Sequence, residues 1–134
     1  MNTTYNSSHG TLVNCIDGTV QLSAIDFAKK IWNVEWVDVI TDAAPERILS
    51  EAKDTEKVDH IHNNIDASLC NQRKKLLAIA SHSDCDINKV SDRKKIEMLQ
   101  RAVNHLKSKH ADADVIGIWV NGEGIPSSLG HETQ

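Results

Sequence analysis

Two short segments far apart in the sequence carry side chains that could bind a metal ion. Cys15 and Asp17 stand in "NCIDGT", and His82 and Cys85 stand in "SHSDCD", each after a run of apolar residues. Thiolate, imidazole and carboxylate groups form a donor set that Zn2+ accepts in tetrahedral sites. Three fixed ligands with one exchangeable position are typical of a catalytic zinc, whereas a structural zinc usually has four Cys or His ligands. The residue types therefore predict zinc chemistry.

Each segment alone also has a simpler interpretation. A cysteine at the end of a strand is often a small buried hydrophobic residue, and His82 with Cys85 can belong to an ordinary loop beside a buried thiol. Asp17 can be an aspartate that caps a turn. The metal interpretation requires a fold that brings residue 15 close to residue 82.

Apolar periodicity predicts the elements that would position these residues. Short apolar runs predict strands, and apolar residues at helical spacing predict the helices between them. The predicted strands are residues 11–15, 35–41, 74–81 and 114–121. The predicted helices are residues 21–32, a short helix opened by Pro45, residues 54–71, and a helix capped by Ser91 with the apolar stripe Ile96, Leu99, Val103 and Leu106.

This alternation of strands and helices predicts the fold class. Strands joined by helices in right-handed crossovers form a parallel sheet covered on both faces. We expect one α/β domain with a mostly parallel sheet of about four to five strands, in which residues 74–81 are central. Residues 1–10 are expected to form a flexible arm, residues 11–121 the domain, and residues 122–134 a loose or edge-covering tail.

The predicted sheet also explains how the two segments can meet. In parallel sheets ligands bind beyond the carboxyl ends of the strands, where the connections reverse direction. "NCIDGT" follows the first predicted strand and "SHSDCD" follows the third. Both segments can therefore open onto the same edge of the sheet.

The motifs C-x-D in "CID" and H-x-x-C in "HSDC" resemble the zinc motifs of β-class carbonic anhydrases, in particular their short prokaryotic relatives. "NCIDGTVQL", "VDVIT", "LLAIASHSDC" and "VIGIWVN" follow in the same order at about the same spacing, so the resemblance covers residues 12–121. It implies an α/β fold, a dimer or multiple of dimers, and reversible hydration of CO2 to bicarbonate by a zinc-bound hydroxide. It also implies that Cys15, His82 and Cys85 hold Zn2+, while Asp17 fills the fourth position or leaves it to water.

One residue departs from the family motif. The motif usually reads C-x-D-x-R, with the arginine drawing the aspartate off the metal, but Thr19 stands at the arginine position. Threonine supplies no charge, so Asp17 has more reason to stay on Zn2+. We expect weak, strongly pH-dependent or lost activity. Arg47, which follows the second predicted strand, is the first candidate to replace the missing arginine.

Two alternatives to a carbonate dehydratase stay open. The same scaffold could hydrolyse a related small electrophile such as COS or CS2 with the same zinc ligands. The chain could also be a non-enzymatic binding or regulatory module that zinc stabilises.

Composition excludes several other classes of protein. The 134 residues suit one domain, and 15 basic against 19 acidic residues give a formal net charge of −4 with no basic stripe. Nucleic acid is therefore not an expected partner. No apolar run approaches the roughly 18 to 20 residues that cross a bilayer, and the polar start "MNTTYNSSHG" does not resemble an export signal. Three scattered cysteines favour a reducing cytoplasm over a disulfide framework.

The other histidines do not form a predicted metal site. His60 and His62 lie two apart on a predicted helix, about 200° around its axis, so they cannot share an ion. His105 and His110 are also poorly placed for that purpose. We expect surface or partly buried positions for all four.

Overall fold

The computed structural model describes residues 8–129 and is built around a five-stranded sheet. The strand order is β2-β1-β3-β4-β5, in which β1 to β4 are parallel and β5 is antiparallel to β4. Within the described residues the strands are β1 (His9–Cys15), β2 (Trp36–Asp42), β3 (Leu76–His82), β4 (Asp114–Val120) and β5 (Pro126–Ser128). The predicted fold class is confirmed, and β3 is the central strand.

Each of the four helices in this region starts at a residue suited to a helix N-terminus. The helices are α2 (Gly18–Trp32), α3 (Pro45–Glu51), α4 (Thr55–Leu69) and α5 (Asp92–Lys109). Asp17, Asp54 and Ser91 cap α2, α4 and α5 because their side chains accept hydrogen bonds from main-chain N–H groups of the first turn. Pro45 occupies the first position of α3, where its missing N–H costs nothing.

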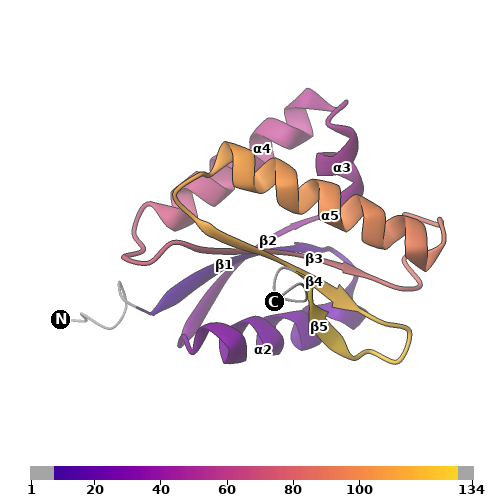
Figure 1. Cartoon of the computed structure of the whole chain (residues 1–134), viewed down its shortest axis with the longest axis horizontal. Coiled ribbons are helices and arrows are strands. Elements are labelled where there is room, and N and C mark those ends of the chain that lie inside the picture. Colours follow the sequence, from indigo (N-terminus) through magenta and orange to yellow (C-terminus); the bar gives the residue numbers. More distant parts are fainter. Residues whose placement is uncertain (1–7, 130–134) are drawn as a thin grey trace.

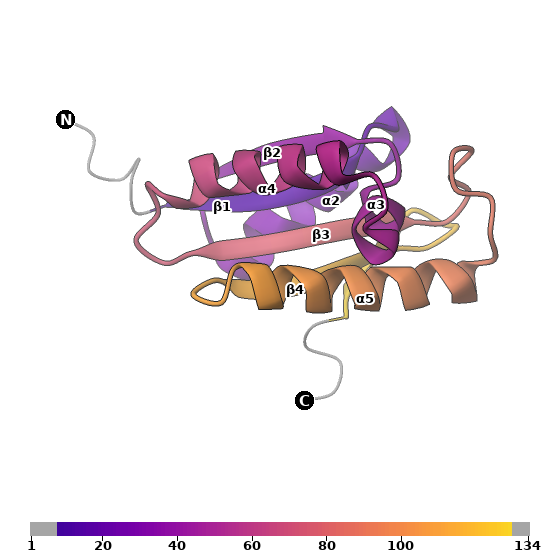
Figure 2. The same ribbon diagram turned by 90° about the horizontal axis from the view of Figure 1, so that it is seen from above.

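The helices cover both faces of the sheet. Figure 1 shows α2 below the sheet and α3, α4 and α5 above it, and the turned view in Figure 2 shows α4 and α5 on opposite sides of β3. The apolar stripe of α5 packs on the sheet: Leu99, Val103 and Leu106 are buried, and Ile96 is partly buried against them. A second core cluster lies between α2 and the sheet and includes both Cys15 and Cys85.

Strands at both ends of the described region extend beyond residues 11–121. Strand β1 begins at His9, so it includes two residues assigned to the N-terminal arm, and β5 forms within the predicted tail. Leu129 N–H also donates to the Gly117 carbonyl, which fastens this segment to β4. The rest of the predicted arm and tail, residues 1–7 and 130–134, lies outside the described residues.

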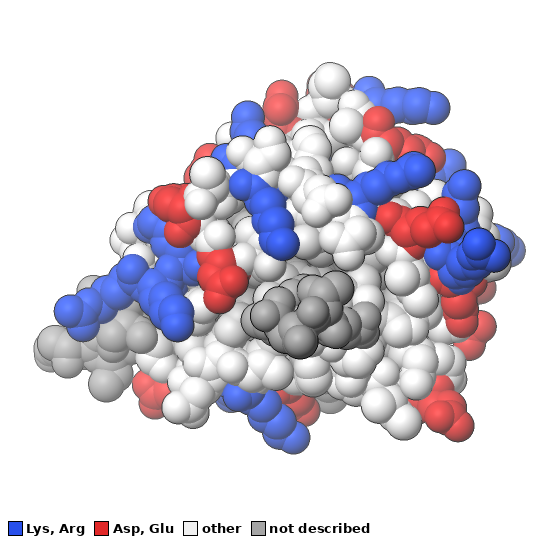
Figure 3. Space-filling view, in the orientation of Figure 1, with Lys and Arg blue, Asp and Glu red and all other residues white. Residues whose placement is uncertain are grey.

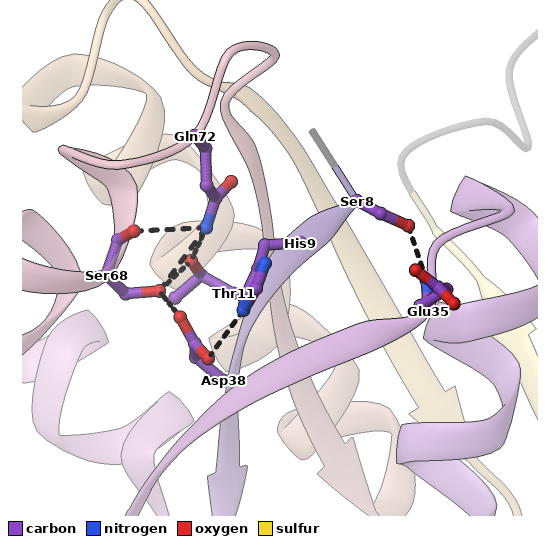
Figure 4. Close-up of polar contacts among 7 residues, drawn as sticks. All are labelled: Ser8, His9, Thr11, Glu35, Asp38, Ser68 and Gln72. Atoms are coloured by element: carbon purple, nitrogen blue, oxygen red, sulfur yellow. Dashed lines mark hydrogen bonds and ion pairs between the residues drawn. The ribbon is translucent and has the colours of Figure 1, made fainter. Parts of the chain in front are cut away.

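A polar network fixes α4 to the sheet at the amino-terminal edge of the strands (Figure 4). Gln72 Nε2 donates to Thr11 Oγ1 at 2.7 Å, and Ser68 Oγ donates to Asp38 Oδ2 at 2.7 Å. His9 Nε2 lies 3.8 Å from the other oxygen of Asp38. The carboxylate therefore stands between the hydroxyl and the imidazole, which is not the Ser–His–Asp order of a hydrolase triad. The network connects β1, β2 and α4.

Across residues 8–129, no helix combines the length and the apolar character needed to span a membrane.

Candidate metal centre

Strand pairing brings Cys15 and His82 to the same edge of the sheet. Strands β1 and β3 are parallel neighbours, with Val13 opposite Ile79, and they end at Cys15 and His82. The carboxyl ends of adjacent parallel strands point in the same direction. Residues that are distant in the sequence thus become neighbours, as the sequence predicted.

The turn after β3 returns Cys85 to the same point. Asp84 has a φ of 60°, a left-handed conformation that aspartate tolerates better than most residues. Ser83 N–H donates to the Val120 carbonyl of β4, and Ser83 Oγ donates to Asp92 at the start of α5. The loop that carries Cys85 is therefore fastened on two sides.

Cys15, His82 and Cys85 form a buried group whose potential ligand atoms all lie within 4.8 Å of one another. Among the described residues no other group of three His, Cys, Asp or Glu meets this condition. The two sulfur atoms are 4.0 Å apart. Two sulfurs about 2.3 Å from one tetrahedral ion would lie about 3.8 Å apart. The group therefore has the dimensions of a zinc site.

The histidine is also in the state that a metal ligand needs. His82 Nδ1 lies 2.9 Å from the Ser83 carbonyl, which only accepts, so this nitrogen carries the hydrogen in the neutral ring. Its Nε2 is then a bare acceptor, and it is buried without a hydrogen-bond partner among the described residues. A buried lone pair without a partner is costly. A metal ion between the two sulfurs and this nitrogen would satisfy it.

Two side chains that sequence reasoning missed hold the main chain of Cys15. Asn14 Oδ1 accepts from the Cys15 N–H at 2.9 Å, and Gln21 Nε2 donates to the Cys15 carbonyl. Gln21 stands in the first turn of α2, so it connects that helix to the end of β1. A glutamine six residues after a cysteine is not a recognisable motif, so the sequence offered no signal for this role.

Asp17 lies beside the group but outside it. As the N-cap of α2, its Oδ1 accepts from the Thr19 N–H at 2.9 Å and from Thr19 Oγ1 at 2.8 Å. These hydrogen bonds, the main-chain one first, hold the pKa of Asp17 below its ordinary value of 3.8. In the part of the chain described, no donor contacts the other oxygen, Oδ2. Thr19 thus contacts Asp17 directly, although as a neutral partner.

Arg47 does not contribute to this arrangement directly. Its Nε lies 3.4 Å from Glu51 Oε2, one turn along α3. It also lines a hollow of about 220 Å3 together with Ile87. Arg47 is therefore near the loop that carries Cys85, while the hydrogen bonds to Asp17 come from Thr19.

The residue before Arg47 makes the more informative contact. Glu46 and Asn88 are each only 1% exposed, and Asn88 Nδ2 donates to Glu46 Oε2 at 2.8 Å. Because Asn88 follows Cys85 by three residues, this hydrogen bond fastens the ligand loop to α3. Sequence reasoning missed both residues, since a glutamate in the first turn of a helix and an asparagine in a loop are usually exposed.

A hollow of about 320 Å3 lies beside Cys85 and is open to solvent. Its lining is mainly charged and comprises Asp84, Cys85, Asp86, Lys89, Val90, Ser91, Asp92 and Lys95. Small polar species can therefore approach the region of the metal centre from this side.

Comparison with models of protein families assigns the chain to a family. A family model described as "Putative carbonic anhydrase" matches residues 5–129. A search of curated proteins and a search of solved structures each gave no match. Because the family match spans nearly the whole chain, including Cys15, Asp17, His82 and Cys85, the protein belongs to this family.

Proposed function

We propose that the protein is a zinc-dependent carbonate dehydratase, which interconverts CO2 and bicarbonate. The observation that carries the proposal is the buried group of Cys15, His82 and Cys85, whose dimensions suit Zn2+ and whose histidine offers a bare nitrogen. Membership of a carbonic anhydrase family supplies the reaction class.

The three buried side chains would hold the metal with two thiolates and one imidazole. When bound, Zn2+ acidifies a coordinated water and so supplies a nucleophile for CO2. The Ser83 carbonyl keeps His82 in the tautomer that leaves Nε2 for the metal. Because two thiolates neutralise the charge of the ion, activity is expected to favour alkaline conditions.

Asp17 is the proposed catalytic carboxylate. Thr19 engages Oδ1, so Oδ2 is available to accept a hydrogen from the reacting water and to orient it. The hydroxyl of Thr19 is neutral and restrains the carboxylate less strongly than a guanidinium would. We therefore expect a slower enzyme than relatives with arginine at this position, and a gain in activity from Thr19→Arg.

We further propose that two or more copies of the chain associate in the cytoplasm. Ile16 and Ile87, close to the ligand residues in the sequence, are 60% and 47% exposed. A second copy that covers them would add apolar surface near the site, where CO2 must be held. The three free cysteines fit a reducing compartment. On the face drawn in Figure 3, acidic and basic side chains are interspersed, which fits small-molecule chemistry better than nucleic-acid binding.

The test is stopped-flow CO2 hydration by zinc-loaded protein at neutral and alkaline pH. We expect activity that increases toward alkaline pH, loss of zinc and activity in Cys15→Ser and Cys85→Ser, and retention of both in the control Cys70→Ser, because Cys70 is exposed. Silence at both pH values with zinc bound would overturn the proposal. COS or CS2 turnover by the same sample would then favour the hydrolase, and its absence the zinc-stabilised module.

A further inference from the structure

Three histidines from two helices meet away from the metal centre. His62 of α4 stands between His105 of α5 and His110, which follows the last turn of α5. His62 Nδ1 lies 2.9 Å from His110 Nε2, and His62 Nε2 lies 2.9 Å from His105 Nε2. We call His105, His62 and His110 the histidine chain. It connects α4 and α5, which cover the same face of the sheet (Figure 1) and lie on opposite sides of β3 in Figure 2.

The burial of this chain contradicts the sequence-based expectation. His62 and His110 are only 4% and 5% exposed, whereas surface or partly buried positions were expected for them. His105 is partly buried and His60 is exposed, as expected. The expectation was wrong because residues 62 and 110 are far apart in the sequence, and their mutual contact satisfies nitrogens that would otherwise need water.

Asp66 fixes the direction of the hydrogen bonds. His110 Nδ1 lies 3.3 Å from Asp66 Oδ1, and a carboxylate only accepts, so Nδ1 carries the hydrogen. In neutral His110 the Nε2 is then an acceptor, so His62 must donate to it from Nδ1. By the same reasoning His62 Nε2 accepts from His105 Nε2–H. The three neutral rings therefore form one directed chain that ends at Asp66.

The geometry of the three imidazole rings suits the binding of protons better than the binding of a metal ion. The two nitrogens of His62 face opposite neighbours, so the three rings do not direct lone pairs at one point. The group of three potential ligands found within residues 8–129 is the cysteine and histidine group of the metal centre.

Counting hydrogens gives the capacity of the chain. Each of the two ring-to-ring contacts holds one hydrogen, His110 Nδ1 holds a third toward Asp66, and the outer Nδ1 of His105 can hold a fourth. Three neutral rings carry three hydrogens, so one added proton fits without breaking a contact. A second added proton would place two N–H groups against each other across a 2.9 Å contact.

Burial and the neighbouring charges together disfavour protonation of the histidine chain. The charged neighbours are Asp66 from α4, Lys109 from α5, and Asp112 from the segment after α5. Burial first, and then the charges of His110, His105 and Lys109, lower the pKa of His62 to about 4, although Asp66 acts in the opposite direction. Burial is also the main cause that lowers the pKa values of His105 and His110.

We propose that the histidine chain is a proton-binding site that makes the contact between α4 and α5 depend on pH. The contact is intact with no added proton or with one, and it opens when a second proton binds. Acid therefore separates α4 from α5 while the metal centre lies at the other edge of the sheet. This inference does not depend on the proposed enzymatic function.

The first experiment determines the hydrogen positions in the full-length protein. Long-range 1H–15N NMR at pH 7 should find hydrogens on Nδ1 of His62, Nδ1 of His110 and Nε2 of His105. The proposal would be overturned if neutral His62 carried its hydrogen on Nε2 and none on Nδ1. The proposal would also be overturned if Zn2+ added beyond one equivalent shifted the NMR resonances of both His62 nitrogens, because that result would identify a metal site.

The second experiment compares urea unfolding of the wild type, His62→Gln and the matched control His60→Gln between pH 7 and pH 4. A histidine whose pKa falls from its ordinary 6.5 to about 4 binds fewer protons when folded, so stability decreases as the pH falls through this window. The folding equilibrium constant should fall by up to tenfold per pH unit for each such histidine. His62→Gln should reduce this slope, and His60→Gln should not. Equal slopes in all three proteins would overturn the proposal; if His62→Gln does not fold, the NMR result on the wild type decides.

Discussion

Replacing Asn88 with alanine should show how strongly the ligand loop depends on one buried hydrogen bond. The side chain of Asn88 donates to Glu46 Oε2 at 2.8 Å, and both residues are 1% exposed. The other oxygen of Glu46 is already without a partner among the described residues. Asn88→Ala would therefore leave a buried carboxylate with no hydrogen bond on either oxygen.

The cost can be estimated from general values. Leaving a neutral buried acceptor unsatisfied costs about 1–3 kcal/mol, and a charged one costs more. We expect Asn88→Ala to lower the free energy of unfolding by about 3 kcal/mol in urea titrations at pH 7. The exposed Asn71→Ala is the matched control and should change it by less than about 0.5 kcal/mol.

A second substitution separates the lost hydrogen bond from simple loss of packing. Glu46→Gln removes the charge, so in the Asn88→Ala background it should restore about 1 kcal/mol or more. Zinc affinity should also fall about tenfold in Asn88→Ala, because Asn88 fastens the loop that carries Cys85 to α3. The reasoning would be refuted if Asn88→Ala lowered the free energy of unfolding by less than about 1 kcal/mol. It would also be refuted if adding Glu46→Gln lowered this free energy further.

Three further substitutions test individual contacts. Thr19→Val removes the hydroxyl that donates to Asp17, so the pKa of Asp17 should rise toward 3.8 in an NMR titration. The ionised carboxylate stabilises the fold, and in the variant this stabilisation should be lost at a higher pH than in the wild type as the solution is acidified. An unchanged titration of Asp17 would contradict this prediction. Gly10→Ala should destabilise the protein by about 1–3 kcal/mol in urea, because the added methyl group overlaps the Trp32 ring; wild-type stability would show that the indole moves freely. Ser91→Ala should cost about 1 kcal/mol by loss of the α5 cap, measured the same way, and no change would show that the cap is replaced by water.

The sequence predicted those features that depend on local pattern. Ser91 caps α5 and Asp54, the first residue of the predicted helix 54–71, caps α4, because a capping side chain stands next to the first turn and is recognisable along the sequence. As a capping residue Asp17 was considered only for a turn, and α2 begins at Gly18, three residues before the predicted start. The meeting of Cys15 with His82 follows from parallel strand order alone. Topology therefore brings Cys15 and His82 together, whereas Cys85 also depends on the turn after β3, in which Asp84 is left-handed and Ser83 is bonded to β4.

Features that depend on contacts between distant side chains were not predictable. Glu46 is charged and lies in a short helix, yet its buried partner Asn88 comes from a loop. His62 and His110 become core residues only because each ring satisfies the other. Thr19 was recognised as a departure from the motif, but its hydrogen bonds to Asp17 depend on the geometry of the α2 N-terminus.

X-ray absorption spectroscopy at the zinc edge on the zinc-loaded protein tests the central claim most directly. If Cys15, His82 and Cys85 hold the ion, the spectrum will show two sulfur neighbours at about 2.3 Å and at least one nitrogen at about 2.0–2.1 Å. The bound zinc, and with it the sulfur shell, will be largely lost in Cys85→Ser, whereas two sulfur neighbours will remain in Cys70→Ser. A first shell of nitrogen and oxygen alone in the wild type would contradict the account.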